Sequence, residues 1–216
     1  MSKKQASNIA TSIRARLLAH AKAEGEDFSY VLTRYASHRL LYRLSKSDYK
    51  ERFILKGATL FSVWKNGEAH RATEDLDLRG SGNNEVEKLI EVFKKICCQE
   101  CQEDGLTFSP EKVEGHKIKE GEEYEGVKVT LWANLSGVEI KVEIDIGFGD
   151  TVTPPAVEIE LPIFGFLNLP LASLRTYRKE TLVAEKFQAM VSLGIMKSRL
   201  KDFYDIWYLS KTSEFE

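Results

Sequence analysis

The sequence is short of cysteine, of proline and of long apolar runs, and each shortage excludes a class of protein. Its 216 residues include three cysteines, all between Cys97 and Cys101, and this odd, clustered set argues against the disulfide framework of a secreted domain. Five prolines are too few for a proline-rich disordered chain. No apolar run approaches the ~20 residues of a membrane span, and the N-terminal lysines are not followed by a signal-peptide core. We therefore expect a cytoplasmic protein with no membrane partner.

Excess charge of one sign is also missing. Lysine and arginine number 31 against 33 aspartates and glutamates, which leaves a formal net charge of −2. Proteins that bind nucleic acid over a broad surface usually carry a basic patch or an elevated pI, so a nucleic-acid partner would have to be held locally. With 43% hydrophobic residues, the chain suits one compact domain, or a small catalytic domain with helical additions.

Apolar residues that recur at helical spacing predict the helices of the chain. The predicted helices cover residues 8–23, 30–44, 83–101, 179–194 and 198–210, with a short one from residue 59. The last two are expected to bury their apolar sides. These sides comprise Leu182, Val183, Phe187, Met190 and Val191 in the first helix and Leu200, Phe203, Ile206, Trp207 and Leu209 in the second.

Alternation of polar and apolar residues predicts the strands. The predicted strands cover residues 53–55, 73–79, 127–131 and 138–146, the last two joined by a turn at 134–137. The proline-punctuated stretch 151–171 is expected to be an irregular crossing that contains at most one short strand. The stretch 111–125, dense in Glu and Lys, is expected to be a solvated loop. The whole pattern predicts an α+β fold, with a mixed, mostly antiparallel sheet, packed helices and helical N- and C-terminal additions.

Two aspartates on one predicted strand are the first candidates for chemistry. Asp75 and Asp77 are two residues apart, so their side chains leave the same face, about 7 Å apart along the chain. Asp145 lies on the polar face of strand 138–146 and could join them from a neighbouring strand. Mg²⁺ prefers carboxylates, waters and substrate phosphates, and two such ions promote the in-line displacement of pyrophosphate. The same Asp-x-Asp pattern is also common on solvated strands that bind no metal.

A glycine turn precedes the acids. The sequence Lys56-Gly57-Ala58-Thr59 joins a predicted strand to a short helix, and its small residues let backbone N–H groups approach phosphate oxygens. An ordinary tight turn with a routine glycine is the alternative interpretation.

Together these elements resemble the nucleotidyltransferase superfamily that includes DNA polymerase β and the antibiotic nucleotidyltransferases, and more closely the AbiEii/AbiGii toxin family. In the superfamily a Gly and a small residue open a helix, an Asp-x-Asp strand follows, and a third acid lies on a later strand. The matching elements are Gly57-Ala58, Asp75-Leu76-Asp77 and Asp145. Ala58 departs from the expected Gly or Ser, which removes a hydroxyl contact to phosphate but preserves close backbone approach.

The resemblance continues in the C-terminal helices. Glu185-Lys186 and the stretch from Arg199 to Asp205 look like the family's Lys motif and its Arg-Asp-x-x-Asp motif. The resemblance implies that Lys186 contacts the triphosphate; a surface lysine paired with an acid is the alternative. Arg199, Asp202 and Asp205 could order that lysine, hold substrate or form a solvated helix face.

The resemblance also implies a division of the chain and a set of roles. Residues 1–50 would be a helical segment, 51–170 the catalytic core, and 171–216 a helical segment that completes the active site. Catalysis and metal binding would fall to Asp75, Asp77 and Asp145, with Lys186 as a further catalytic residue. Nucleotide binding would involve Lys56, Gly57, Ala58, Thr59, Arg199 and Asp202. Arg71, in the loop before the acids, could bind phosphate or simply be exposed.

The implied activity is transfer of a nucleoside monophosphate from an NTP to an acceptor hydroxyl, with two Mg²⁺ ions as cofactors. The family's link to type IV toxin–antitoxin systems suggests tRNA or another RNA as acceptor, and a cognate antitoxin that acts without forming a stable complex. A protein or small-molecule acceptor, or a nucleotide-binding module without turnover, are the alternatives.

Overall fold

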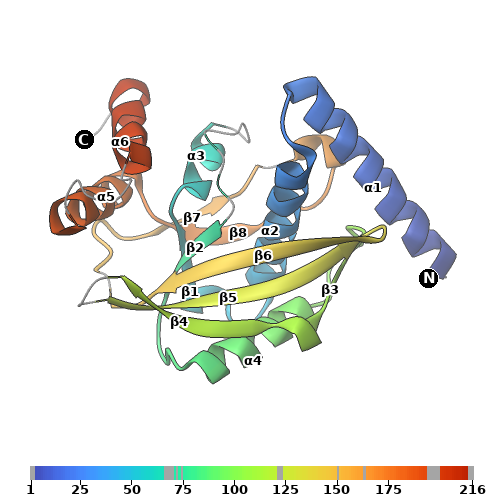
Figure 1. Ribbon diagram of the computed structural model, residues 1–216, viewed down its shortest axis with the longest axis horizontal. Coiled ribbons are helices and arrows are strands. Elements are labelled where there is room, and N and C mark those ends of the chain that lie inside the picture. Colours follow the sequence, from blue (N-terminus) through green and yellow to red (C-terminus); the bar gives the residue numbers. More distant parts are fainter. Residues whose placement is uncertain are drawn as a thin grey trace.

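The structure of the chain is a computed structural model (Figure 1), which describes residues 3–65, 71, 73, 75–120, 124–149, 151–162, 164–193 and 200–213. Its helices are α1 (Lys3–Glu24), α2 (Phe28–Lys46), α3 (Thr59–Trp64), α4 (Val86–Cys97), α5 (Lys179–Leu193) and α6 (Leu200–Thr212). Its strands are β1 (Phe53–Lys56), β2 (Asp75–Gly80), β3 (Leu106–Phe108), β4 (Glu114–Glu120), β5 (Tyr124–Leu135), β6 (Val138–Gly147), β7 (Val157–Glu160) and β8 (Ser173–Thr176). Among the described residues, no helix is long and apolar enough to cross a membrane.

The strands form one mixed sheet in the order β3-β5-β6-β2-β1-β8-β7, with β4 also paired to β5. Antiparallel pairs dominate, but β2 runs parallel to β6 and β1 runs parallel to β8. The predicted α+β class with a mostly antiparallel sheet is therefore confirmed. The parallel β2–β6 pair brings the Asp-x-Asp strand beside the strand that carries the third acid.

One face of the sheet is apolar and is covered by α2 and α4. Leu55, Leu78 and Ile146, from β1, β2 and β6, are each at most 1% exposed on this face. Because alternate residues of a strand point to opposite faces, the polar positions between them point away from the core. The opposite face is where the acids lie.

The solvated loop expected at 111–125 is wrong for most of the residues that the structure describes there. Residues Glu114–Glu120 form β4, which pairs antiparallel with β5 in the register Glu114↔Thr130 to Glu120↔Tyr124. Glu and Lys are depleted in strands, so local preference did not reveal β4. Its backbone is ordered by the long neighbouring strand rather than by an oily face of its own.

The apolar sides of α5 and α6 are buried only in part, which corrects the expected burial. Leu182 and Leu209 form a small cluster with Phe61 of α3, apart from the main core. Val183 and Tyr208 pack against this cluster, and other large side chains of the two helices do not. Exposed positions are Phe187, Val191, Leu200, Phe203 and Trp207, with Leu200 79% accessible. Periodicity identified an apolar side but could not show that no sheet lies beneath it.

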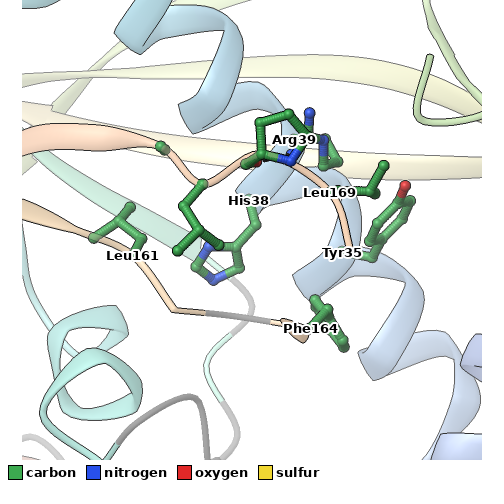
Figure 2. Close-up of a pocket in the computed structure, with 9 residues that line it drawn as sticks. Tyr35, His38, Arg39, Leu161, Phe164 and Leu169 are labelled. Carbon is green, nitrogen blue, oxygen red and sulfur yellow. Dashed lines mark hydrogen bonds between the residues drawn. The ribbon is translucent and has the colours of Figure 1, made fainter. Parts of the chain in front are cut away.

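A segment between β7 and β8 crosses α2 and fixes it to the sheet (Figure 2). Arg39 donates a hydrogen bond of 2.8 Å to the carbonyl oxygen of Pro170, and Phe164 packs edge-on against Tyr35 and His38. The cavity that they line is about 20 Å³, which suits a water molecule rather than a substrate. Burial, with the charges of neighbouring arginines, lowers the pKa of His38 to about 3, so this imidazole is neutral at physiological pH.

Candidate active site

A row of charged side chains crosses four neighbouring strands on the face away from the core. Lys56 of β1 pairs in register with Asp77 of β2, Asp77 with Asp145 of β6, and Asp145 with Lys128 of β5. Directly paired residues share a face of the sheet, so the two aspartates lie side by side between two lysines. Asp75 lies on the same face of β2, in register with Glu143 of β6. The expected arrangement of three acids on neighbouring strands is therefore present.

Gly57 lies directly against Asp77. Its φ is +70°, a left-handed conformation that favours glycine, and a Cβ placed there would be 2.6 Å from the Cβ of Asp77 and closer still to its carboxylate. Normal carbon contacts begin near 3.5 Å. The glycine is thus needed for close approach as well as for the turn, and it brings backbone next to the acid.

Asp77 has the most perturbed acidic group of the row. Burial raises its pKa to about 7, and the neighbouring Asp145 carboxylate adds to the shift, whereas the positive charges of Lys56 and Lys186 oppose it. A carboxylate that is costly to ionise without a partner cation is a good candidate for binding one.

Lys128 is the site residue that the sequence analysis missed. Its Nζ lies 3.0 Å from Oδ1 of Asp145 and 3.7 Å from Oδ2 of Asp75. Burial alone would lower the pKa of Lys128, but Asp145 and Asp75 outweigh it and raise the pKa. The β5–β6 turn could have revealed this residue. A two-residue turn with φ of 50° at Ser136 and 83° at Gly137 fixes the hairpin register, which sets Lys128 opposite Asp145.

Helices α5 and α6 contribute a buried ion-pair network beside the acids. Nζ of Lys186 lies 2.7 Å from Asp202 and 2.9 Å from Asp205. Arg71 donates two hydrogen bonds, of 2.9 and 2.8 Å, to the carboxylate of Asp205. Burial alone would raise the pKa of Asp205, but these cations outweigh it and lower the pKa. Asp202 and Asp205 thus order Lys186, one of the roles expected for them, while Arg199 falls outside the described residues.

The predicted phosphate turn lies next to these groups. Lys56 forms an ion pair with Glu185 of α5. Ala58 and Thr59 line a cavity of about 30 Å³ that is also bordered by Arg71 and Asp75. The structure therefore brings together all predicted site residues that it describes; their roles in binding and catalysis stay predictions.

The donor atoms of the row fit a hard divalent cation. Asp77 and Asp145 offer carboxylate oxygens from paired positions, and Mg²⁺ is usually held by one or two carboxylates together with waters and substrate phosphates. Within the described part of the chain, no three Asp, Glu, His or Cys side chains already form a metal cluster. The residues therefore suit an ion that a substrate helps to bind, rather than a closed protein cage.

Comparison with solved structures supports the fold. A candidate nucleotidyltransferase from H. pylori matches with a TM-score of 0.50 and 15% identity, over 80% of this chain and 64% of its own. JHP933 from Helicobacter pylori matches with a TM-score of 0.50 and 16% identity, over 82% of this chain and 66% of its own. The chain thus spans slightly less than two thirds of these proteins. At such low identity the likeness concerns the fold alone.

Comparison of sequences identifies the family. No curated protein matches the chain. The family profile described as "Nucleotidyl transferase AbiEii toxin, Type IV TA system" matches residues 39–216, which include every charged residue of the row and of the α5–α6 network. The chain belongs to the AbiEii nucleotidyl transferase toxin family of type IV toxin–antitoxin systems.

Proposed function

We propose that the protein is a Mg²⁺-dependent nucleotidyltransferase that moves a nucleoside monophosphate from an NTP to an acceptor hydroxyl and releases pyrophosphate. The observation that carries this proposal is the pairing of Asp77 with Asp145 on parallel strands, with Gly57 against Asp77. Such a pair can hold cations at the reacting phosphate while the glycine leaves space for the phosphate to approach. Family membership supports the same chemistry.

The acids Asp75, Asp77 and Asp145 would hold the metal ions. Bound Mg²⁺ would supply Lewis acidity, lowering the pKa of an attacking hydroxyl and neutralising charge on the phosphates. Asp145, whose side chain is 30% exposed, would help to hold the ion that activates the acceptor hydroxyl. Because burial makes Asp77 costly to ionise alone, its carboxylate has most to gain from a cation.

The other residues would bind and orient the triphosphate. The Gly57-Ala58-Thr59 turn would receive phosphate oxygens on its backbone. Lys186 has three N–H donors, of which Asp202 and Asp205 engage two, so the third can meet a phosphate oxygen without breaking the network. The two carboxylates around Lys186 fix the direction of its ammonium group.

For the acceptor we propose tRNA or another RNA, with the protein as the toxin of a type IV pair and a cognate antitoxin as its partner. Support for this part comes from the family alone. The near-zero net charge implies local rather than broad contact with an RNA.

The test is incubation of the purified protein with each α-³²P-labelled NTP, Mg²⁺ and one of three acceptor pools: tRNA, protein extract or small alcohols. We expect label in tRNA, and a loss of at least about 10²-fold in Asp77→Asn. The matched control is Glu139→Gln, which removes a carboxylate from the same face of β6 near its other end. This variant should label tRNA like the wild type.

Other outcomes would change the proposal. Label in protein or in a small alcohol would replace the RNA acceptor. Label transferred from the γ-phosphate instead of the α-phosphate would refute nucleotidyl transfer. If the folded protein neither transfers label nor binds NTP in the presence of Mg²⁺, the remaining interpretation is a non-catalytic module.

A further inference from the structure

We propose that Lys128 is a built-in counter-ion of the catalytic acids, which it holds in the metal-free protein and must leave when Mg²⁺ enters. Metal loading would then be weak in the free protein and would be driven by the triphosphate. This inference rests on the proposed function, because it concerns the same acids.

The position of Lys128 follows from the backbone. In the β5–β6 hairpin it lies directly opposite Asp145, and β2 places Asp77 on the far side of Asp145. The ammonium group contacts two of the three acids, at 3.0 Å from Asp145 and 3.7 Å from Asp75. It therefore lies between two carboxylates that the proposed function assigns to metal.

The second lysine of the row has an additional partner. Lys56 lies opposite Asp77 and its charge favours the ionised form of that acid, but it is also paired with Glu185 of α5, a residue outside the three acids. Lys128 is engaged by the acids themselves, with a side chain that is 20% exposed. A flexible, partly exposed lysine can swing into solvent, whereas the acids are held in place by strand register.

Competition is the physical consequence. A divalent ion bound by Asp145 and Asp75 would lie within a few ångströms of the ammonium, and like charges at such a distance repel strongly even when well solvated. The separation of Lys128 from Asp145 and Asp75 then opposes metal binding and weakens the net affinity for the ion. A triphosphate adds several negative charges at the same place. These charges attract the metal ions and can also form an ion pair with the displaced ammonium of Lys128.

The test measures metal binding without catalysis. Mn²⁺ is the probe, because carboxylate sites that take Mg²⁺ also take Mn²⁺, and EPR reports its free concentration directly. We expect Lys128→Met to lower the Mn²⁺ dissociation constant at least about tenfold, the effect of one unit charge close to a divalent ion even at the screening of bulk water. Competition with MgCl₂ at constant ionic strength should give the same ratio between the Mg²⁺ dissociation constants of wild type and Lys128→Met.

Two variants serve as controls. Lys141→Met removes an equal charge from the face of β6 that carries Asp145. Lys141 lies 2.9 Å from Glu143 and four positions before Asp145 in the strand. Lys128→Arg keeps the charge in place. Both should bind Mn²⁺ like the wild type, and far-UV circular dichroism with the melting temperature checks that every variant is folded.

The outcomes separate this inference from the proposed function. Equal Mn²⁺ affinity in wild type and Lys128→Met, or equal tightening by Lys141→Met, would overturn the role of Lys128 while leaving nucleotidyl transfer intact. A non-hydrolysable NTP should bring the Mn²⁺ dissociation constants of Lys128→Met and wild type closer together. An unchanged ratio of the two constants would overturn the coupling to the triphosphate. Absence of Mn²⁺ binding in both proteins would contradict the metal site itself.

Discussion

The contact between Gly57 and Asp77 allows a sharp test of the site. In Gly57→Ala the new methyl carbon would lie 2.6 Å from the Cβ of Asp77, so β2 or the turn must move by about 1 Å to restore a normal contact near 3.5 Å. Rotation of the carboxylate cannot relieve this overlap, because a Cβ is fixed by the backbone. The substitution also puts alanine at a φ of +70°, which costs about 1 kcal/mol.

The matched control separates these two costs. Gly82 has a φ of +80°, and a Cβ placed there meets nothing within 4 Å. Gly82→Ala should therefore lose only the conformational term, about 1 kcal/mol. Gly57→Ala should lose a further 1–3 kcal/mol, roughly the usual penalty for overpacking.

Two measurements check the prediction. Urea unfolding followed by tryptophan fluorescence gives the two stabilities, and transfer of α-³²P label gives activity. A displacement of about 1 Å at a catalytic group can cost on the order of 10²-fold in rate, so Gly57→Ala should lose that much while Gly82→Ala stays active. Equal stability of the two variants, together with full activity of Gly57→Ala, would refute the close approach of turn and acid.

Three further predictions concern charge. Asp77→Asn should stabilise the metal-free protein by about 2 kcal/mol at pH 8 and by almost nothing at pH 4. The shift of the Asp77 pKa from 3.8 to about 7 sets an upper limit near 4 kcal/mol on this stabilisation, and the partial exposure of the side chain reduces it. The stabilisation should increase between pH 4 and 7, where the aspartate of the wild type ionises. Unfolding curves at both pH values with EDTA test this, and a pH-independent gain would contradict it. Asp205→Asn should destabilise by about 3 kcal/mol in the same assay, because its buried carboxylate holds two cations. Loss of the exposed Glu91–Lys94 pair in Glu91→Gln should leave the unfolding curve almost unchanged. Replacement of His38 by Leu should reduce acid sensitivity, because the imidazole stays neutral in the fold down to a pKa of about 3, whereas the unfolded chain takes up a proton below about 6.5. The His38 term alone costs the wild type roughly 2 kcal/mol between pH 7 and 5, so the stability of the variant relative to the wild type should rise by about that amount over this range, and a difference that stays constant would contradict it.

Local patterns were sufficient where a property depends on neighbours in the chain. Alternation placed Asp75 and Asp77 on one face of a strand, and the helices at both ends of the chain were found from their apolar spacing. Local patterns failed where the structure of a segment depends on elements distant in the chain. β4 is ordered by hydrogen bonds to β5 despite its Glu and Lys content, and the apolar sides of α5 and α6 find only a small cluster to pack against.

By itself the sequence determined which residues are candidates for the chemistry, because the two-residue period of a strand and the conformational freedom of glycine are local properties. The turn predicted at 134–137 is too long: Asn134 and Leu135 belong to β5, and the two-residue turn at Ser136-Gly137 sets the β5–β6 register. Only the tertiary structure decided that Asp77 is partly buried and that β2 runs parallel to β6, which sets Asp145 beside it; burial first, and then Asp145, raise the pKa of Asp77. The tertiary structure also decided that Asp205 of α6 meets Arg71. Pairing between strands far apart in the chain depends on how the whole core is buried, and no local preference encodes it.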